Sequence, residues 1–569
     1  MLICNTEKQE KLKNTVAHIL LIALLGLLFP ALLSAQTTEN HIQLELIIQG
    51  KGAVRPDQPP PYKKGQTVTL TFYPSGRARF SAKPDAPTAP SDDPLAGWVF
   101  DHWSLSENSL QANSGLENPL QLTLKEDTKL YVTFLPMGTN AHLNETQDRQ
   151  LRALAGGGFE GWEAATKEQA NGLHRKAENY LNEYFEYNEQ WGQPATVWWK
   201  DFQRKAPFGY DFLGEGTTWA GMHLQALALK YSVNPEDETT KRAMLRVLGA
   251  LDRNSQIMGV PGRVARFSGP SSDSAYHWYY KNVRVGAFPG AAPWEHMTWL
   301  GKPTRDTHTG LFAGLAAIAA LCKETPEVYR MAGDITERVV DRLLADDWKI
   351  KGTQEGYRAL NGKDLKQLQM RTAYAFNPDK YKSFEKPIRD YRLKLKEGKS
   401  LYDKLYWVEW MTWARAMGII ILEGDAGKMP GYLEQVNAFF EKKVHHLNPY
   451  YTAVACYLNN LDNNETITPG LKEKAHALLE GLLLAYPDGP KWGREVDLFK
   501  DGKFAAKDEK HVTVAVFPNE RVNADFNAQR SAARAKGGSN RQSYQYTNFD
   551  MYLAYWLGRA AGLMSPEDK

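Results

Sequence analysis

Residues 305–322, RDTHTGLFAGLAAIAALC, decide the fold class, because a polar start leads into a helical run that is apolar on every side. Three other stretches share this character: TTWAGMHLQALALKY at 217–231, NPYYTAVACYLNNL at 448–461 and TNFDMYLAYWLGRAAGL at 547–563. A helix without a polar face must be surrounded by other helices. The sequence therefore predicts a set of inner helices that pack around a common axis.

Helices of a second kind alternate with these apolar runs. The stretch EVYRMAGDITERVVDRLLADDW at 327–348 carries one charged face, which is typical of a helix that meets water on one side. The helical runs are predicted at 166–189, 217–231, 238–254, 308–322, 326–345, 364–376, 402–423, 430–442, 447–461, 470–486 and 547–563. Inner and outer helices in alternation predict an (α/α)6 toroid over residues 139–569. A superhelical stack of helix pairs is the alternative, but the sequence has no clean repeat of fixed period.

Residues 36–138 follow another pattern, in which apolar side chains recur at every second position. The alternating runs lie at 42–48, 68–72, 120–124 and 130–134. Alternation of this kind is typical of strands with one buried face, and Gly50 and Gly52 supply a turn between the first strands. The sequence therefore predicts a small antiparallel β module that precedes a mainly α domain.

The β module carries motifs that resemble a known family. The stretches GKGAV (50–54), YKKGQTVTLTFYP (62–74), GWVFDHWS (97–104) and ENPLQLTLKEDTKLYVTF (117–134) are similar to the divergent internalin B-type repeat, a β-grasp-like module of bacterial surface proteins. The resemblance implies a spacer or adhesive element without catalytic residues. It places Trp98, Phe100 and Trp103 in the core, and a sugar-stacking role for these rings is the alternative.

The first residues have the composition of a secretory signal peptide, which we place at 1–35. Lys8, Lys11 and Lys13 precede an apolar run over 16–33, and small residues follow at a point suited to cleavage before Gln36. An uncleaved membrane anchor is the alternative. We therefore expect a secreted, periplasmic or cell-surface protein, and association with the cell envelope is compatible with either reading.

The composition of the 569-residue chain narrows the classes of partner. Lys and Arg number 69 against 66 Asp and Glu, and no long run of one sign occurs, so nucleic acid is not an expected partner. The 16 Trp, 27 Tyr and 22 Phe favour either heavy burial or a surface that stacks sugar rings. Cys322 and Cys456 lie in apolar helical runs and are either buried thiols or one disulfide.

Two long connections, at about 255–306 and 487–546, hold the candidate site residues, because long loops in a compact domain are usually functional. The candidate catalytic residues are Asp306, His308, Tyr276 and His277. The candidate substrate-binding residues are Arg263, Arg266, Trp278, Trp294, Arg305, Asp525, Arg530 and Asp550. Both connections run into inner helices, so a toroid would bring them together over one end of the ring.

Each candidate has a structural alternative. Asp306 and His308 start an inner helix, where Arg305 and free amides favour an anion, but Asp306 or Thr307 would also make an ordinary N-cap. Tyr276 or His277 is either a proton-abstracting base or part of a packed aromatic loop. Trp278 and Trp294 either stack on sugars or pack, and Arg263 and Arg266 either clamp carboxylates or are surface charges. Asp525 and Arg530 either bind ligand or pair with each other. Asp550 could serve as the acid of a hydrolase pair.

The helical region also resembles a known group. The stretches GVPGRVAR (259–266), WLGKPTRDTHTGLFAGLAAIA (299–319), DFNAQRSAARAKGG (525–538) and YTNFDMYLAYWLGRAAGL (546–563) look like an uncharacterised group of secreted bacterial (α/α)6 proteins. More loosely, they resemble toroidal polysaccharide lyases and unsaturated glucuronyl hydrolases. In the lyases a Tyr or His takes the proton beside a uronate carboxylate that Arg or Asn neutralises, whereas the hydrolases use a carboxyl pair. Neither catalytic set matches this chain residue by residue.

Together these patterns predict a secreted carbohydrate-active enzyme that acts on acidic poly- or oligosaccharide. A polysaccharide lyase is favoured slightly over a glycoside hydrolase, because Tyr, His and Arg dominate the candidate loops. The alternative is a non-catalytic cell-surface protein that binds glycan or protein. No cofactor is expected, and no metal site, because no two of His223, His277, His296 and His308 have helical ligand spacing.

The predicted export of the protein can be tested directly. If residues 1–35 are a cleaved signal, mass spectrometry of the exported protein should find Gln36 at or near the amino terminus, because signal peptidase cuts after small residues. An intact Met1 in the membrane fraction would support the anchor instead.

Overall fold

The computed structural model describes the greater part of the chain. The described residues are 41–50, 52–74, 98–106, 114–115, 120–136, 143–155, 158–159, 161–199, 207–352, 356–359, 361–391, 406–424, 430–443, 447–461, 469–486, 544–545, 547 and 549–564. The candidates Asp525 and Arg530 and the proposed signal at 1–35 lie outside these ranges. Among the described residues, no helix has the length and apolar character needed to cross a membrane.

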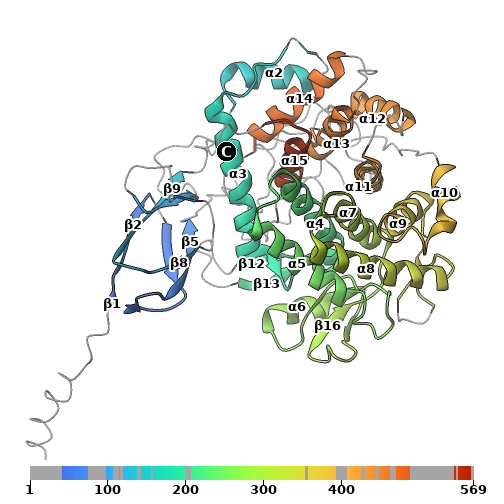
Figure 1. Cartoon of the computed structure of the whole chain (residues 1–569), viewed down its shortest axis with the longest axis horizontal. Helices are drawn as coiled ribbons and strands as arrows, with labels where there is room; N and C mark the ends of the chain where they lie inside the picture. Colours follow the sequence, from blue (N-terminus) through green and yellow to red (C-terminus); the bar gives the residue numbers. More distant parts are fainter. Residues whose placement is uncertain are drawn as a thin grey trace, which may run out of the picture.

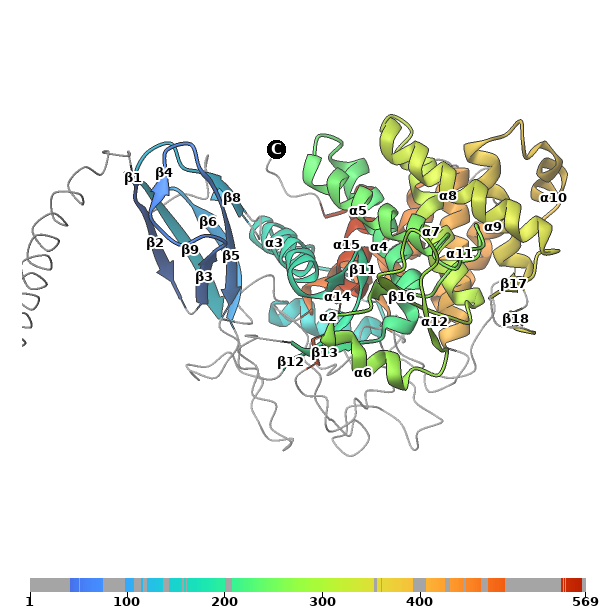
Figure 2. The same ribbon diagram turned by 90° about the horizontal axis from the view of Figure 1, so that it is seen from below.

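Two small sheets form the amino-terminal part (Figure 2). The first has the order β2 (Leu44–Gln49), β9 (Thr128–Pro136), β6 (Trp98–Ser104), β7 (Ser114–Gly115), and the second has the order β3 (Gly52–Pro56), β5 (Thr67–Pro74), β8 (Leu120–Thr123). A short pair, β1 (His41–Ile42) and β4 (Tyr62–Lys63), stands beside them.

The predicted alternation explains the core of these sheets. The inward-facing side chains of β5 and β9 are buried and form one cluster: Val68, Leu70, Phe72, Leu130, Val132 and Phe134. Two details differ from the sequence prediction. β2 pairs with β9 in parallel, so the module is not purely antiparallel, and Ile48 is 41% exposed at the end of β2. Pairing direction depends on how the chain crosses between strands, which alternation along one strand does not encode.

The remainder of the described chain is mainly helical (Figure 1). The helices are α2 (Glu145–Ala155), α3 (Lys167–Glu183), α4 (Gly216–Val233), α5 (Glu238–Asn254), α6 (Ser274–Asn282), α7 (Arg305–Leu321), α8 (Pro326–Ala345), α9 (Lys363–Phe376), α10 (Glu385–Arg389), α11 (Tyr406–Glu423), α12 (Pro430–Lys443), α13 (Pro449–Asn460), α14 (Pro469–Leu484) and α15 (Phe549–Ala560). The prediction of a mainly α domain is confirmed, and every predicted run contains a helix.

The first long connection proved more ordered than its weak periodicity indicated. It contains α6 and a three-stranded sheet of β14 (Ser268–Pro270), β16 (Met297–Leu300) and β15 (Ala287–Pro289). A second small sheet joins β12 (Thr196–Trp199) to β13 (Pro207–Asp211) and to the distant β19 (Tyr544–Gln545). Helices α2, α6 and α10 were not predicted. These elements are short and depend on tertiary contacts rather than on a long periodic pattern.

The buried helices contact one another in a closed circuit. α4 contacts α7, α7 contacts α11, α11 contacts α13, α13 contacts α15, and α15 returns to α4. In Figure 1 these helices occupy the centre of the molecule, while α2, α14, α12, α10, α9 and α8 lie around them. Within the described part of the chain, five helices complete the circuit. Helices α5 and α8 each bury one face only, as their amphipathic patterns predicted.

α4 and α7 pack more closely than side chains would allow. A Cβ placed on Gly310 would lie 2.0 Å from the Thr218 carbonyl oxygen, and one on Gly221 would lie 2.0 Å from the Gly310 carbonyl oxygen. A Cβ placed on Gly314 would likewise clash, at 2.3 Å from the carbonyl oxygen of Gly221. Glycine at these positions therefore lets the two backbones touch, and it brings the starts of the two helices together.

The β module and the helical part have separate cores. Their hydrophobic clusters share no residue among the described ones, and α3 lies next to the β module (Figure 2). Cys322 and Cys456 belong to the helical core and are free, buried thiols, which settles the sequence alternatives against a disulfide. Burial raises the pKa of the Cys322 thiol to about 12.

A single methyl group should disturb the α4–α7 contact. Gly310→Ala should destabilise the protein by about 1–3 kcal/mol or more, because the added Cβ overpacks against backbone that cannot rotate away. Gly249→Ala on α5 is the matched control, since a Cβ there meets nothing within 4 Å, and it should stabilise by about 0.5–1 kcal/mol. Denaturant unfolding measures both; equal effects would show that the close approach is not required.

Candidate functional site

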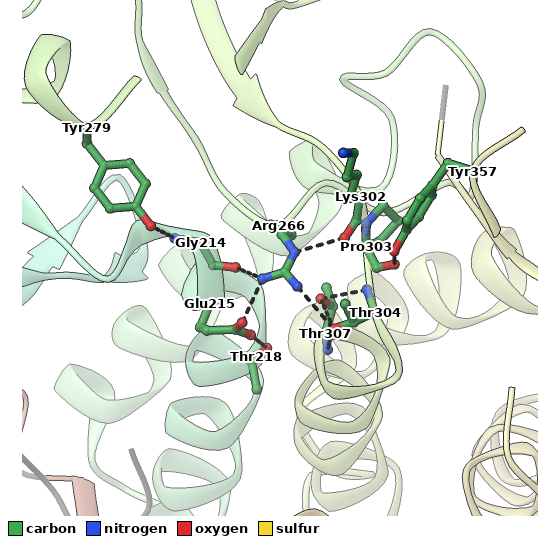
Figure 3. A network of polar contacts seen from close by, with 10 residues as sticks. All are labelled: Gly214, Glu215, Thr218, Arg266, Tyr279, Lys302, Pro303, Thr304, Thr307 and Tyr357. Atoms are coloured by element: carbon green, nitrogen blue, oxygen red, sulfur yellow. Dashed lines mark hydrogen bonds and ion pairs between the residues drawn. The ribbon is translucent and has the colours of Figure 1, made fainter. Parts of the chain in front are cut away.

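The starts of α4 and α7 are joined by the Arg266 side chain, which lies buried between them (Figure 3). Nη1 donates to the Gly214 carbonyl and to Glu215 Oε1 at 2.6 Å, on the α4 side. Nε donates to the Lys302 carbonyl at 2.9 Å, and Nη2 donates to Thr304 Oγ1 at 3.4 Å, on the α7 side. The guanidinium therefore holds two helix starts in one arrangement, and its partners are protein groups.

The cap of α7 is Thr304, so the expectation of Asp306 or Thr307 as the N-cap was wrong. Thr304 Oγ1 accepts the amide of Thr307, and Thr307 Oγ1 accepts the amide of Thr304, which forms a reciprocal capping box. Asp306 occupies the first turn instead, where the helix dipole favours a carboxylate. Because the Thr304 hydroxyl already accepts the Thr307 amide, the helix does not need the Asp306 side chain as its cap.

Two non-glycine residues with left-handed backbone flank this site. Phe212 has φ +59° and precedes α4, and Lys302 has φ +53° and precedes α7. Such conformations cost free energy and are retained where the surroundings fix them. Here Asp211 Oδ1 accepts the Phe212 amide at 2.7 Å and Arg266 binds the Lys302 carbonyl, so strain is held at both helix starts.

Glu215 and Asp306 are the carboxyl groups at these two starts, and we refer to them together as the carboxyl pair. Glu215 precedes α4, accepts from Arg266 and from the Thr218 hydroxyl at 3.0 Å, and interacts electrostatically with Asp306. Burial raises the pKa of the Glu215 carboxyl; Arg266 opposes this rise, and the Asp306 carboxylate adds to it. A carboxyl with a raised pKa beside a second carboxylate is the arrangement that general acid–base chemistry uses.

Asp306 and His308 do not act as a pair in this structure. Residues two apart on a helix point to different sides, and His308 Nδ1 faces Gln369 Nε2 of α9 at 3.5 Å. His308 is buried, and burial lowers its pKa to about 4. The contacts therefore place His308 in the packing between α7 and α9, where its lowered pKa favours the neutral imidazole.

Tyr276 and His277 also lie in structural roles. The Tyr276 ring is buried with Phe267, Leu213 and Leu300, and its hydroxyl donates to Gln190 Oε1 at 2.8 Å. Burial raises the pKa of this hydroxyl, which opposes a role as a base. His277 is exposed, and its Nε2 lies 3.1 Å from the Ser271 carbonyl oxygen. The aromatic-loop alternative is thus the one that the contacts favour.

The other predicted residues are dispersed. Arg263 Nε lies 3.6 Å from an Asp346 carboxylate oxygen, and Nη1 donates to the Gly352 carbonyl. Its guanidinium is therefore engaged with groups of the protein itself. Trp294 is half-buried against the cluster of Ile257 and Met258, and Arg305 is exposed in the first turn of α7. The side chains of Trp278 and Asp550 lie outside the description, as do Asp525 and Arg530.

Two residues that sequence analysis missed complete the site. Glu215 lies just before the apolar run that begins at 217, as Asp306 lies just before another apolar run. A carboxylate at the start of two inner helices is the signal that could have found it. Arg415 is buried on α11 and interacts electrostatically with Asp306 and Asp364. Nothing in the sequence around Arg415 distinguishes it from a packed residue of an apolar helix.

Aromatic rings from four inner helices gather next to the pair. Trp219, one residue after Thr218, stacks on Phe549 with ring centroids 5.4 Å apart and meets Trp410 at 5.1 Å. Trp410 in turn contacts Tyr450 of α13 at 5.9 Å. The polar helix starts therefore stand on an apolar aromatic layer, which lowers the local dielectric constant and strengthens charge interactions.

Known proteins give no further guidance to the site. Comparisons with family models, curated proteins and solved structures found no match to the chain. Within the described residues, no group of three or more His, Cys, Asp and Glu side chains is arranged to hold a metal ion. The chemistry must therefore be inferred from the contacts themselves.

The cap and the carboxylate of α7 can be separated by substitution. Thr304→Ala should cost about 0.5–2 kcal/mol of stability, because it removes the oxygen that accepts the Thr307 amide. Asp306→Asn should change stability by only a few tenths of a kcal/mol, since its oxygen is not the cap. Thermal unfolding of both variants, with Thr304→Ser as the control that keeps the hydroxyl, distinguishes the two; a larger loss in Asp306→Asn would contradict the assignment.

Proposed function

We propose that this protein is a secreted glycoside hydrolase that acts on acidic poly- or oligosaccharide. The observation that carries the proposal is the carboxyl pair, Glu215 and Asp306, on two helix starts whose backbones touch. Glycoside hydrolysis requires two carboxyl groups on opposite sides of the scissile bond, one to protonate the leaving oxygen and one to serve as base or nucleophile.

The environments of the two groups suggest their roles. The Glu215 side chain is 29% exposed, and its partial burial raises its pKa, so it retains a proton at higher pH than an ordinary glutamate and suits the general acid. Asp306, half-buried in the first turn of α7, is the base or nucleophile. Arg266 fixes the Glu215 carboxyl through Oε1, and Thr218 binds Oε2.

Hydrolysis is favoured over elimination because the candidate bases for elimination are buried and hydrogen-bonded. Elimination needs a tyrosine or histidine that can take a proton beside a uronate. Tyr276 is buried with a hydrogen-bonded hydroxyl of raised pKa, and His308 is buried against Gln369. The sequence alone favoured a lyase because these residue types are abundant, whereas the contacts favour the carboxyl pair.

The surrounding architecture belongs to the same proposal. We infer that the closed circuit of inner helices and the outer helices constitute an α/α toroid. The amino-terminal sheets are proposed to be a spacer of the internalin B-type repeat class. Residues 1–35 are proposed to direct export, which agrees with a substrate outside the cytoplasm.

A non-catalytic glycan-binding protein is the second candidate. Such a protein would bind through the polar helix starts, because the rings of Trp219 and Trp410 are buried, at 6% and 1% exposed, and cannot stack on a sugar face. A binding protein does not need a carboxyl with a raised pKa, so activity of the carboxyl variants decides between the two.

The test is a screen of the mature protein against uronate-containing polysaccharides. We expect release of reducing ends without the new absorbance of unsaturated ends. Glu215→Gln and Asp306→Asn should each lower kcat by about a hundredfold or more, the usual scale for a positioned proton-transfer group. In the wild type, kcat/KM should fall as pH rises through the raised Glu215 pKa, because the acid then loses its proton.

Glu238→Gln on α5 is the matched control for these variants. Glu238 is 63% exposed and pairs only with the neighbouring Lys241 among the described residues, so its replacement should leave kcat and stability unchanged. Unaltered turnover in both site variants would rule out the carboxyl pair, and unsaturated ends among the products would indicate a lyase.

A further inference from the structure

Arg415 of α11 is a buried cation that the proposed mechanism does not use. Only 8% of the residue is exposed. Nη1 donates to Thr309 Oγ1 at 3.1 Å, and Nη2 donates to Thr412 Oγ1 at 3.2 Å. Both partners are neutral hydroxyls, which stabilise a buried guanidinium less than a carboxylate does.

The remaining donors of this guanidinium are not satisfied by described residues. A guanidinium carries five N–H donors, and the Nε of Arg415 is buried without a hydrogen-bond partner in the described part of the chain. Asp364 and Asp306 attract the charge, while Arg305 repels it and Tyr391 also faces it. The Asp364 carboxylate already accepts the Tyr391 hydroxyl at 2.5 Å. A buried donor without an acceptor is costly, and at Arg415 it accompanies a charge that forms no ion pair with a described carboxylate. The two observations together indicate a place for an acceptor from outside.

Arg371 of α9 provides the contrast. Its side chain is similarly buried, at 10% exposed, and its Nε also lacks a hydrogen-bond partner among the described residues, but its charge forms an ion pair with Glu423 and it donates to the Ile388 carbonyl at 2.9 Å. The chain thus supplies a carboxylate to one buried arginine and two hydroxyls to the other. Arg415 is the one placed for an added anion.

The position of Arg415 connects it to the carboxyl pair. Thr309 lies three residues after Asp306, so the two side chains share one face of α7 and are neighbours on it. Because Arg415 binds Thr309, its guanidinium lies on the Asp306 face, one turn further along the helix. A ligand group at Arg415 would therefore lie within one sugar unit of the proposed reaction centre.

We propose that Arg415, with Thr309 and Thr412, forms the subsite that binds the anionic group of a sugar ring. The site takes a planar carboxylate, whose two oxygens match the fork of a guanidinium; a sulfate ester offers related oxygen chemistry. This subsite rests on the proposed function for its place in catalysis, but binding of an acidic sugar can be measured without turnover.

The experiment measures binding of glucuronate, glucose 6-sulfate and glucose to the mature protein by calorimetric titration or ligand-observed NMR. Wild type should bind glucuronate at least tenfold more tightly than glucose. Arg415→Met should abolish that preference, and Arg415→Lys should weaken it, because an ammonium cannot form the forked contact. Arg371→Met is the control: it removes a buried arginine that has its own carboxylate and should leave the preference intact.

Each result decides the matter. Equal wild-type affinity for glucuronate and glucose would overturn the subsite even if Arg415→Met fails to fold, because that comparison needs no variant. A retained preference in folded Arg415→Met would also overturn it, and a stronger preference for glucose 6-sulfate would overturn the carboxylate assignment. Glu215→Gln should keep the glucuronate preference while losing turnover. Loss of the preference with normal hydrolysis of a neutral glycan would reject the subsite alone, whereas glucuronate binding without any hydrolysis would reject the hydrolase alone.

Discussion

The contact between the backbones of α4 and α7 is the constraint on which the rest of the site depends. Glycines at 221, 310 and 314 remove the side chains that would separate the helices. The close approach places the residues that precede and begin both helices next to each other, so Glu215 and Asp306 interact although they are far apart in the sequence. Packing in the core thus determines chemistry at the surface end of the helices.

Arg266 makes that arrangement specific. Its guanidinium binds backbone carbonyls and side-chain oxygens from both helix starts, so a shift of either helix would leave buried donors unpaired. The same contacts hold Lys302 in a strained backbone conformation. An arginine can bind a substrate carboxylate or join two helices, and only the atoms that its guanidinium contacts distinguish these roles.

Periodicity along the chain was sufficient for the helices with long periodic patterns and for the faces of the strands, but it missed α2, α6 and α10. The runs at 238–254 and 326–345 coincide with α5 and α8, because a long amphipathic pattern has one way to bury its apolar side. Alternation in β5 and β9 likewise gave the buried side chains of the sheet. The parallel pairing of β2 with β9 and the short elements between α5 and α7 depend on contacts between distant segments, which a local pattern does not record.

The sequence by itself determined that α7 is an inner helix with a polar start, and that Asp306 lies at that start. It also offered Tyr276, His308 and Arg266 as candidates, because their residue types suit catalysis. Tertiary structure alone decided their roles. Burial and hydrogen bonds place these three in the packing, whereas Glu215 and Arg415 interact electrostatically with Asp306. The physical reason is that a pKa and an unpaired donor are properties of an environment assembled from several helices, and no single stretch of sequence contains that environment.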